Sequence, residues 1–320
     1  MKKILITGIT GFAGSCLAEH LLATQKDLQV YGTYLSDQSL ENVSSIQNTL
    51  HLEKIDLTDF AAVKSLIKEI KPTEIYHLAA LPGSASSLKD PASFLLNNIN
   101  AQLYLLEALR EANLLESRIV VVGSGLIYGR SNPADKPIDE KRALQPHTPY
   151  DVSKIAQDFM GLQYFNAYGM PIMRARPFNH AGARLSDQFV ISAFSKKIAE
   201  IEKGKREPVL TVGNLDSKRD ITDVHDMVRA YALLMEKGIP GEAYNLGRGQ
   251  SYKIADLLQK LLSFSQIKIE VKEDSSLIRT NDIPDMVCDA TKFVQLTGWK
   301  PEVSIDQTLK DTLEYWERQI

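Results

Sequence analysis

The feature that most constrains the fold is a glycine-rich turn close to the N-terminus. An apolar run, Lys3–Gly8, leads into Gly11 and Gly14 at G-x-x-G-x-x-G spacing, and a helix-like stretch follows over Ala13–Leu22. Such glycines permit a sharp turn, close approach of a ligand to the backbone, and close packing of helix on strand. A purely structural turn carries the same residues, so the pattern gains its weight from the strand before it and the helix after it.

Strand-like and helix-like segments alternate through the first half of the chain. Apolar runs predict strands at Lys3–Gly8, Gln29–Tyr34, His51–Asp56, Glu74–Ala79, Arg118–Gly123 and Pro171–Arg176. Between them, Phe60–Ile70 and Ala101–Ala112 place apolar residues at helical spacing. This alternation implies right-handed crossovers, so we expect an α/β fold, a Rossmann-type doubly wound parallel sheet with helices on both faces.

The regular alternation of strand-like and helix-like segments ends after about Pro177. Loops rich in Asn, Gly, Arg and Asp separate helical runs at Asp223–Lys237 and Tyr252–Ser263, and Ser304 with Gln307 predicts a capping box before a last helix. We predict a smaller, interleaved C-terminal substrate domain. The expected division is residues 1–177 plus 223–246 for the Rossmann domain, and residues 178–222 plus 247–320 for the substrate domain.

Composition excludes several classes of protein. The 320 residues are 44% hydrophobic and 24% charged, as in ordinary globular proteins, and the net charge of -3 gives no case for nucleic-acid binding. No stretch approaches the about 20 apolar residues of a membrane span. Cys16 and Cys288 lie far apart without metal-ligand spacing, so we expect no metal site, and a reducing cytoplasm fits best.

The glycine-rich turn predicts a dinucleotide site, because the helix that follows offers free N–H groups and the positive end of its dipole to phosphates. At the end of the third predicted strand, Asp56 and Leu57 suit the edge and wall of an adenine, although Asp56 suits a turn equally well. The end of the second strand has neither the acid typical of NAD sites nor the arginine typical of NADP sites. Thr33 and Ser36 can donate to a phosphate there, so we expect NADPH or NADH, with a lean towards NADPH.

Tyr150 and Lys154 have Y-x-x-x-K spacing on a predicted helix, so their side chains emerge from one face. An ammonium beside a tyrosine favours the phenolate and is expected to lower the tyrosine pKa, and Lys154 can also bond the nicotinamide ribose. Ser124 directly follows the fifth predicted strand, at the edge where doubly wound sheets bind ligands. We expect Ser124, Tyr150 and Lys154 to be catalytic, although a tyrosine packed on a lysine stem gives the same spacing.

With these motifs in place, the chain resembles the extended short-chain dehydrogenase/reductase superfamily over essentially its whole length. The signatures that carry the resemblance are Thr7–Gly14, which includes Phe12 and Ala13, then His77-Leu78-Ala79-Ala80, Asn98, Ser124, Tyr150–Lys154 and Arg176–Asn179. The resemblance implies that Ala79 and Ala80 line the cofactor path near the nicotinamide, with Leu78 and Asn98 among the cofactor-binding residues. His77, on an apolar strand, is expected to be a core residue rather than a base.

Within that superfamily the second half is similar to the GDP-sugar branch. The matching segments are Phe178-Asn179-His180, Phe189-Val190, Val212–Asp220 and Arg279–Asp282. The resemblance implies a GDP-linked sugar as substrate. The guanidinium groups of Arg219 and Arg279 suit bidentate bonds to a diphosphate, unless each is a surface ion pair. The other expected substrate contacts are Asn179 to the diphosphate, Asp282 to ribose hydroxyls, Val190 and Val212 to base or sugar, and Asn214.

Leu126 decides between the reactions of this branch. The dehydratases of the GDP-sugar branch carry a glutamate two residues after the Ser/Thr, as the base for the sugar C5 proton. Leu126 stands at that position here, and leucine cannot move a proton. Reduction of a 4-keto group of a GDP-4-keto-6-deoxyhexose needs only Ser124, Tyr150 and Lys154. The segment Ala181–Arg184 departs from the version typical of the reductases, which leaves the sugar open.

Several alternatives stay open at this point. They are a dTDP-4-keto-6-deoxysugar reductase, a GDP-mannose 4,6-dehydratase, a sugar 4-epimerase that recycles bound NAD, and a non-catalytic NAD(P)-binding protein. The resemblance also implies a homodimer through the helices Ala92–Ala112 and Tyr150–Gly169. From the residues alone, the same helix faces are predicted only to be buried.

Overall fold

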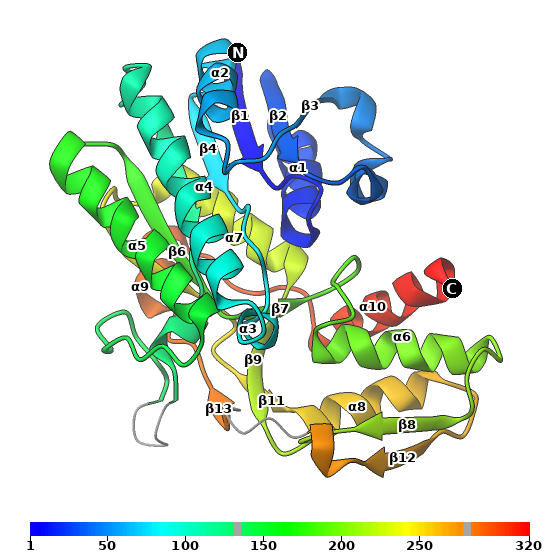
Figure 1. Cartoon of the computed structure of the whole chain (residues 1–320). Coiled ribbons are helices and arrows are strands. Elements are labelled where there is room, and N and C mark those ends of the chain that lie inside the picture. The colour runs from blue at the N-terminus through cyan, green and yellow to red at the C-terminus, as the bar shows by residue number, and fades with distance from the viewer. Residues whose placement is uncertain (131–135, 278–282) are drawn as a thin grey trace.

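A parallel sheet of seven strands forms the centre of the larger part of the molecule (Figure 1). The structure is a computed structural model that describes residues 1–130, 136–277 and 283–320. The strand order is β10-β6-β5-β4-β1-β2-β3, and every neighbouring pair is parallel. The bounds are β1 Lys2–Thr7, β2 Leu28–Tyr34, β3 Leu50–Lys54, β4 Glu74–His77, β5 Arg118–Val122, β6 Ile172–Pro177 and β10 Ala243–Leu246. The predicted doubly wound parallel sheet is confirmed.

Helices cover both faces of this sheet because successive strand residues point to opposite sides. Ile4 and Ile6 pack in a core with α1 and α7, whereas Leu5, between them, packs in a second core with α2, α4 and α5. The bounds are α1 Phe12–Thr24, α2 Phe60–Ile70, α4 Pro91–Glu111, α5 Pro149–Tyr168 and α7 Val224–Lys237.

Local sequence explains where these helices begin and end. Asp59 caps α2, since its Oδ1 accepts from the amides of Ala61 at 3.0 Å and Ala62 at 3.1 Å. The predicted capping box of the last helix is half correct. Ser304 accepts from the Gln307 amide at 3.2 Å, but the Gln307 side chain donates to Asp311 instead of returning to the cap.

Most of the remaining strands, with helices α6, α8 and α10, form a second region below the large sheet in Figure 1. One small sheet has the order β11-β9-β13 with β7 beside β9, and another pairs β12 with β8. Helices α6, α8 and α10 enclose its core. The bounds are β7 Asn179–Ala181, α6 Val190–Glu202, β8 Val209–Val212, β9 Lys218–Asp223, β11 Ser251–Lys253, α8 Ile254–Phe264, β12 Glu270–Glu273, β13 Asp285–Met286 and α10 Ile305–Gln319.

The chain crosses between the two regions more than once. It leaves the large sheet after β6, returns with α7 and β10, and leaves again at β11. The residue boundaries of the two domains stay a prediction. Shorter elements are α3 Ser84–Ser87, α9 Thr291–Thr297, and the 3-10 helices η1 Asp37–Val43, η2 Gln47–Thr49, η3 Gly125–Tyr128 and η5 Ser275–Leu277. Within the described ranges, none of the helices has the length and apolar character to cross a membrane.

Candidate active site

The glycine-rich turn joins β1 to α1 in a conformation that only small residues permit. Gly8 has φ of +70°, and a Cβ placed on Gly14 would lie 2.2 Å from the Gly8 carbonyl oxygen. Helix α1 begins behind Gly11, which supplies no side-chain cap to its first amides. The uncapped helix end and the bare turn fit the phosphates of a dinucleotide.

The two hydroxyl residues expected at the end of β2 differ in their surroundings. Thr33 is buried, and its Oγ1 accepts from the Gly8 amide at 3.2 Å, so it supports the turn from below. Ser36 is exposed at the start of η1. Of the two hydroxyls predicted to donate to a phosphate, only that of Ser36 lies at the surface. Sequence reasoning missed Lys54, which ends β3 and pairs with Asp37 of η1 at 2.5 Å.

The residues expected around the adenine lie at the end of β3. Asp56 accepts from both the amide and the hydroxyl of Thr58, at 2.8 and 2.7 Å, so the turn that the sequence left open is present. Its side chain is exposed, whereas Leu57 is buried against α2. A contact of either residue with a base stays a prediction.

The residues after β4 form a half-buried segment beside the turn. Leu78, Ala79 and Ala80 are partly buried, and the backbone of Ala79 would meet a Cβ on Gly8 at 3.1 Å. Asn98 is fully buried: its Oδ1 accepts from the Leu81 amide at 2.7 Å, and its Nδ2 donates to Ser153 at 3.0 Å. Asn98 therefore ties this segment to α5, and its contact with the cofactor stays a prediction.

The three predicted catalytic residues come together from two elements. Ser124 follows β5, and its hydroxyl interacts with the phenol of Tyr150 on α5. Lys154 lies one turn further along α5, with its Nζ 5.9 Å from the centre of the Tyr150 ring. That Nζ donates to the Val122 carbonyl at 2.9 Å. The end of β5 and the first turns of α5 thus build one cluster.

The expected lowering of the tyrosine pKa is wrong for this state of the protein. Desolvation raises the pKa of Tyr150 to about 12, although the bond with Ser124 acts in the opposite direction. Burial also lowers the pKa of Lys154 to about 7, because the charged ammonium is disfavoured away from water. The lysine therefore loses much of the charge that was expected to stabilise a phenolate.

Leu126 and His77 are packed beside the cluster. Leu126 donates its amide to Ser124 Oγ at 3.1 Å and packs its side chain against an apolar cluster. His77 is buried, and its Nδ1 lies 2.9 Å from the hydroxyl of Thr7. Burial lowers the pKa of His77 to about 3, so it is a neutral core residue and not a base.

The expected substrate residues within the described ranges occupy the second region. Asn179 begins β7 and Val190 begins α6, and both side chains are exposed. Arg219 on β9 donates through Nη1 to the carbonyl of Ile283 at 2.5 Å, and Asn214 is half-buried between β8 and β9. The structure gives Val212 a packing role in place of the predicted contact with base or sugar, because its side chain is buried in the core. Arg279 and Asp282 lie outside the described residues.

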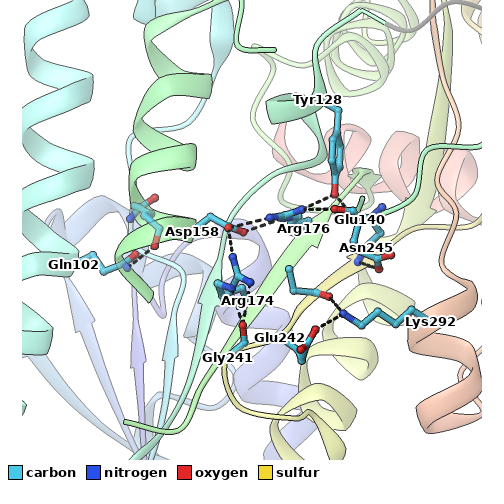
Figure 2. A network of polar contacts seen from close by, with 12 residues as sticks. Gln102, Tyr128, Glu140, Asp158, Arg174, Arg176, Gly241, Glu242, Asn245 and Lys292 are labelled. Carbon is cyan, nitrogen blue, oxygen red and sulfur yellow. Dashed lines mark hydrogen bonds and ion pairs between the residues drawn. The ribbon is translucent and has the colours of Figure 1, made fainter. Parts of the chain in front are cut away.

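A buried ionic network beside α5 was not predicted. Asp158 accepts from Arg174 at 2.6 Å and from Arg176 at 2.8 Å, and both arginines project from the same face of β6 (Figure 2). The signal was present in the sequence, since two arginines alternate on a strand that is otherwise buried. Charged side chains at such positions require a partner.

Comparison with known proteins gives matches over nearly the whole chain. A family model described as GDP-mannose 4,6 dehydratase matches residues 5–312. The GDP-6-deoxy-D-mannose reductase of Pseudomonas aeruginosa strain PAO1 is 31% identical over 319 residues, which cover 100% of this chain and 98% of the relative. The GDP-mannose 4,6 dehydratase 1 of Arabidopsis thaliana is 29% identical over 97% of this chain and 88% of the relative.

A solved structure also matches throughout. The structure of RMD from Pseudomonas aeruginosa complexed with NADPH has a TM-score of 0.88 at 30% identity, and the match covers 100% of both chains. The similarity is therefore that of a complete fold and not of a single motif.

Proposed function

The chain belongs to the GDP-mannose 4,6 dehydratase family, and within it we propose a reductase that acts on the C4 keto group of a GDP-4-keto-6-deoxyhexose. The electron donor is NADPH or NADH, and the product is a GDP-6-deoxyhexose such as GDP-rhamnose or its C4 epimer. The resemblance predicted from the sequence is thereby confirmed at the level of the family.

The observation that carries the proposal is the pair of Ser124 and Tyr150, whose hydroxyls interact beside Leu126. Reduction of a ketone requires one proton for the oxygen and a group that holds that oxygen. It requires no base at C5, and the side chain of Leu126 cannot act as one. The identity of 31% to a protein named as a GDP-6-deoxy-D-mannose reductase supports the same choice.

The protonation state of Tyr150 suits this direction of the reaction. With its pKa raised to about 12, the phenol holds its proton at neutral pH and is ready to give it to the alkoxide that forms at C4. Ser124 shares the hydrogen bond and orients the carbonyl oxygen at the same point. A bound nicotinamide cofactor supplies the hydride to the carbonyl carbon.

The residues proposed to hold that cofactor are those of the glycine-rich turn, with Ser36 at the ribose end and Lys154 at the nicotinamide ribose. The bare, uncapped start of α1 supports this assignment. NADPH in the solved structure of RMD supports a cofactor of this class. The diphosphate of the substrate is assigned to Asn179 and Arg219, with Arg279 as a further ligand.

We further propose that the protein works as a cytoplasmic homodimer. The exposed side chains of Leu96 on α4 and of Val152 and Phe159 on α5 are large and apolar. Phe159 also lines a cleft of about 410 Å³ on the same helix. Exposed apolar groups on two adjacent helices are typical of a surface that a second subunit covers.

The test is incubation of the purified protein with NADPH or NADH and with GDP- or dTDP-linked 4-keto-6-deoxy sugars, followed by NMR of the product. Stoichiometric oxidation of the cofactor with the GDP sugar, and a new C4–H resonance, support the proposal. NMR also distinguishes the two C4 configurations. Three other results would each replace the proposal with one of the alternatives. They are dehydration of GDP-mannose, recycling of a tightly bound NAD, and binding without turnover.

A further inference from the structure

We propose that Arg176 is a positioning residue that fixes Ser124 relative to Tyr150, because it joins the two elements that carry them. The inference rests on the proposed function for its kinetic consequence. Its geometric content, the placement of one hydroxyl against another, does not depend on which sugar is reduced.

One edge of the Arg176 guanidinium holds the catalytic helix. Its Nε donates to Asp158 Oδ2 at 2.8 Å and its Nη2 donates to Oδ1 at 3.0 Å, a bidentate pair (Figure 2). Asp158 lies on α5 one turn beyond Lys154, and its side chain is buried. Since bidentate pairing fixes angle as well as distance, this contact sets the height and rotation of α5 against β6.

The other edge holds the element that carries Ser124. Nη1 of Arg176 donates to the hydroxyl of Tyr128 at 2.8 Å, and Tyr128 donates in turn to Asn245 Oδ1 at 2.8 Å. Tyr128 is fully buried and is the last residue of η3. Ser124 is the N-cap of that same single-turn helix. A shift of Tyr128 therefore moves Ser124.

The rigid fork of an arginine makes this connection possible, since a planar guanidinium presents its donors at fixed angles. Arg176 thus links β6 to α5 and to η3 at once, with Asn245 of the neighbouring β10 closing the network. The interaction of Ser124 with Tyr150 spans the same two elements. The network and the catalytic bond are two connections between the same pair of elements.

Arg174 provides a matched internal control. It binds the same carboxylate, with Nη1 at 2.6 Å from Asp158 Oδ1. Its other contacts go to the carbonyl of Gly241, at 3.2 Å from Nε and 2.9 Å from Nη2, and not to η3. Loss of Arg174 therefore removes charge and packing from α5 but leaves the link to Ser124 in place.

The experiment compares Tyr128→Phe, Arg176→Lys and Arg174→Lys in the full-length protein. Tyr128→Phe and Arg176→Lys are expected to lower kcat at least about tenfold, because small misplacements of reacting groups are costly. The Kd for NADPH stays close to the wild-type value in both. Arg174→Lys is expected to lower the melting temperature and to leave kcat little changed.

A second readout does not depend on turnover. In protein labelled with [ζ-13C]tyrosine, the Tyr150 resonance, assigned through Tyr150→Phe, reports the hydrogen bond with Ser124. It should shift in Tyr128→Phe and stay in place in Arg174→Lys. If no keto sugar is a substrate but the resonance behaves in this way, the positioning role stands and only the proposed function fails.

Chemical rescue of an Arg176 variant provides a further test. Arg176 lines a cleft of about 530 Å³ together with Glu140 and Lys292, so a small guanidine can enter its place. Methylguanidine added to Arg176→Ala is expected to restore part of the lost kcat. The proposal is overturned if Tyr128→Phe keeps both wild-type kcat and an unshifted Tyr150 resonance. It is also overturned if Arg174→Lys loses as much kcat as Arg176→Lys.

Discussion

The hydroxyl of Ser124, at the end of β5, interacts with the phenol of Tyr150, at the start of α5. The contact places a proton donor and an oxygen-orienting group at one point. With a pKa of about 12 the phenol is protonated at neutral pH, so the pair is prepared to give a proton rather than to take one. Lys154, the third member, carries a cost for the folded state that can be measured.

Lys154 makes stability depend on pH. Its pKa falls from 10.5 in the unfolded chain to about 7 in the folded protein, so between these values the unfolded chain binds more protons. The free energy of unfolding therefore gains a contribution that rises with pH, by at most about 1.4 kcal/mol per unit. We expect Lys154→Met to remove this rise between pH 7 and 9 and to be more stable than wild type at pH 7.

Urea denaturation at several pH values measures the effect as the difference between variant and wild type. Lys310→Met is the control, because the Lys310 side chain is 58% exposed. An equal pH slope in wild type and Lys154→Met would show that the lysine is not desolvated.

Alanine variants at two glycines of the glycine-rich turn are expected to lose different amounts of stability. Alanine at position 14 places its Cβ 2.2 Å from the Gly8 carbonyl oxygen, whereas alanine at position 11 places it at 3.1 Å. Backbone atoms cannot yield easily, so Gly14→Ala is expected to cost about 1–3 kcal/mol of stability and Gly11→Ala less. Thermal unfolding ranks the two, and an equal loss in both would contradict the close packing of α1 on the turn.

Lys54 and Asp37 are expected to set the preference between NADPH and NADH. Their ion pair lies at the end of β2, where a 2′-phosphate of the cofactor is expected, and both side chains are exposed. Exposed pairs are weak, so Lys54 is free to turn towards a phosphate. Lys54→Gln should weaken binding of 2′,5′-ADP and NADPH several-fold but leave NADH unchanged.

Asp37→Asn is the complementary variant and should strengthen binding of NADPH, since it removes a carboxylate close to the phosphate. Calorimetric titration of both variants with the two cofactors gives the answer. Equal effects of Lys54→Gln on NADPH and NADH would exclude the lysine from recognition of the 2′-phosphate.

The proposed dimer surface predicts that Phe159→Glu gives a monomer. The Phe159 side chain is 50% exposed on α5, and a carboxylate there would be buried without a partner at a subunit interface. Ile239→Glu is the control, because Ile239 is 54% exposed between α7 and β10. Sedimentation velocity decides, and a monomeric wild type would remove the proposal.

Six of the seven strands of the large sheet were predicted, because buried parallel strands carry apolar runs, and β10 was missed. The predicted run Arg118–Gly123 matches β5, and Phe60–Ile70 is α2 to the residue. The small strands of the second region, such as β11 at Ser251–Lys253, are too short and polar to give a pattern. They form by pairing, β7, β11 and β13 with β9, and β12 with β8.

The candidate site was predictable as a set of residues but not as an environment. Y-x-x-x-K spacing brings Tyr150 and Lys154 together, yet only the fold shows that burial removes much of the charge of Lys154. The position of Thr33 beneath the turn could not be predicted either, since the sequence cannot show which side of β2 meets Gly8. The partners of Arg176, Asp158 and Tyr128, are distant in sequence, so no local pattern reveals its role.

The central claim is that Tyr150 protonates a C4 alkoxide in a GDP-4-keto-6-deoxyhexose reductase. The direct measurement is single-turnover oxidation of NADPH by GDP-4-keto-6-deoxy-D-mannose in wild type and Tyr150→Phe, with the Kd for NADPH measured alongside. The account predicts turnover by wild type and a loss of at least about 100-fold in Tyr150→Phe at unchanged Kd. Near-wild-type turnover by Tyr150→Phe, or no turnover by wild type, would contradict it.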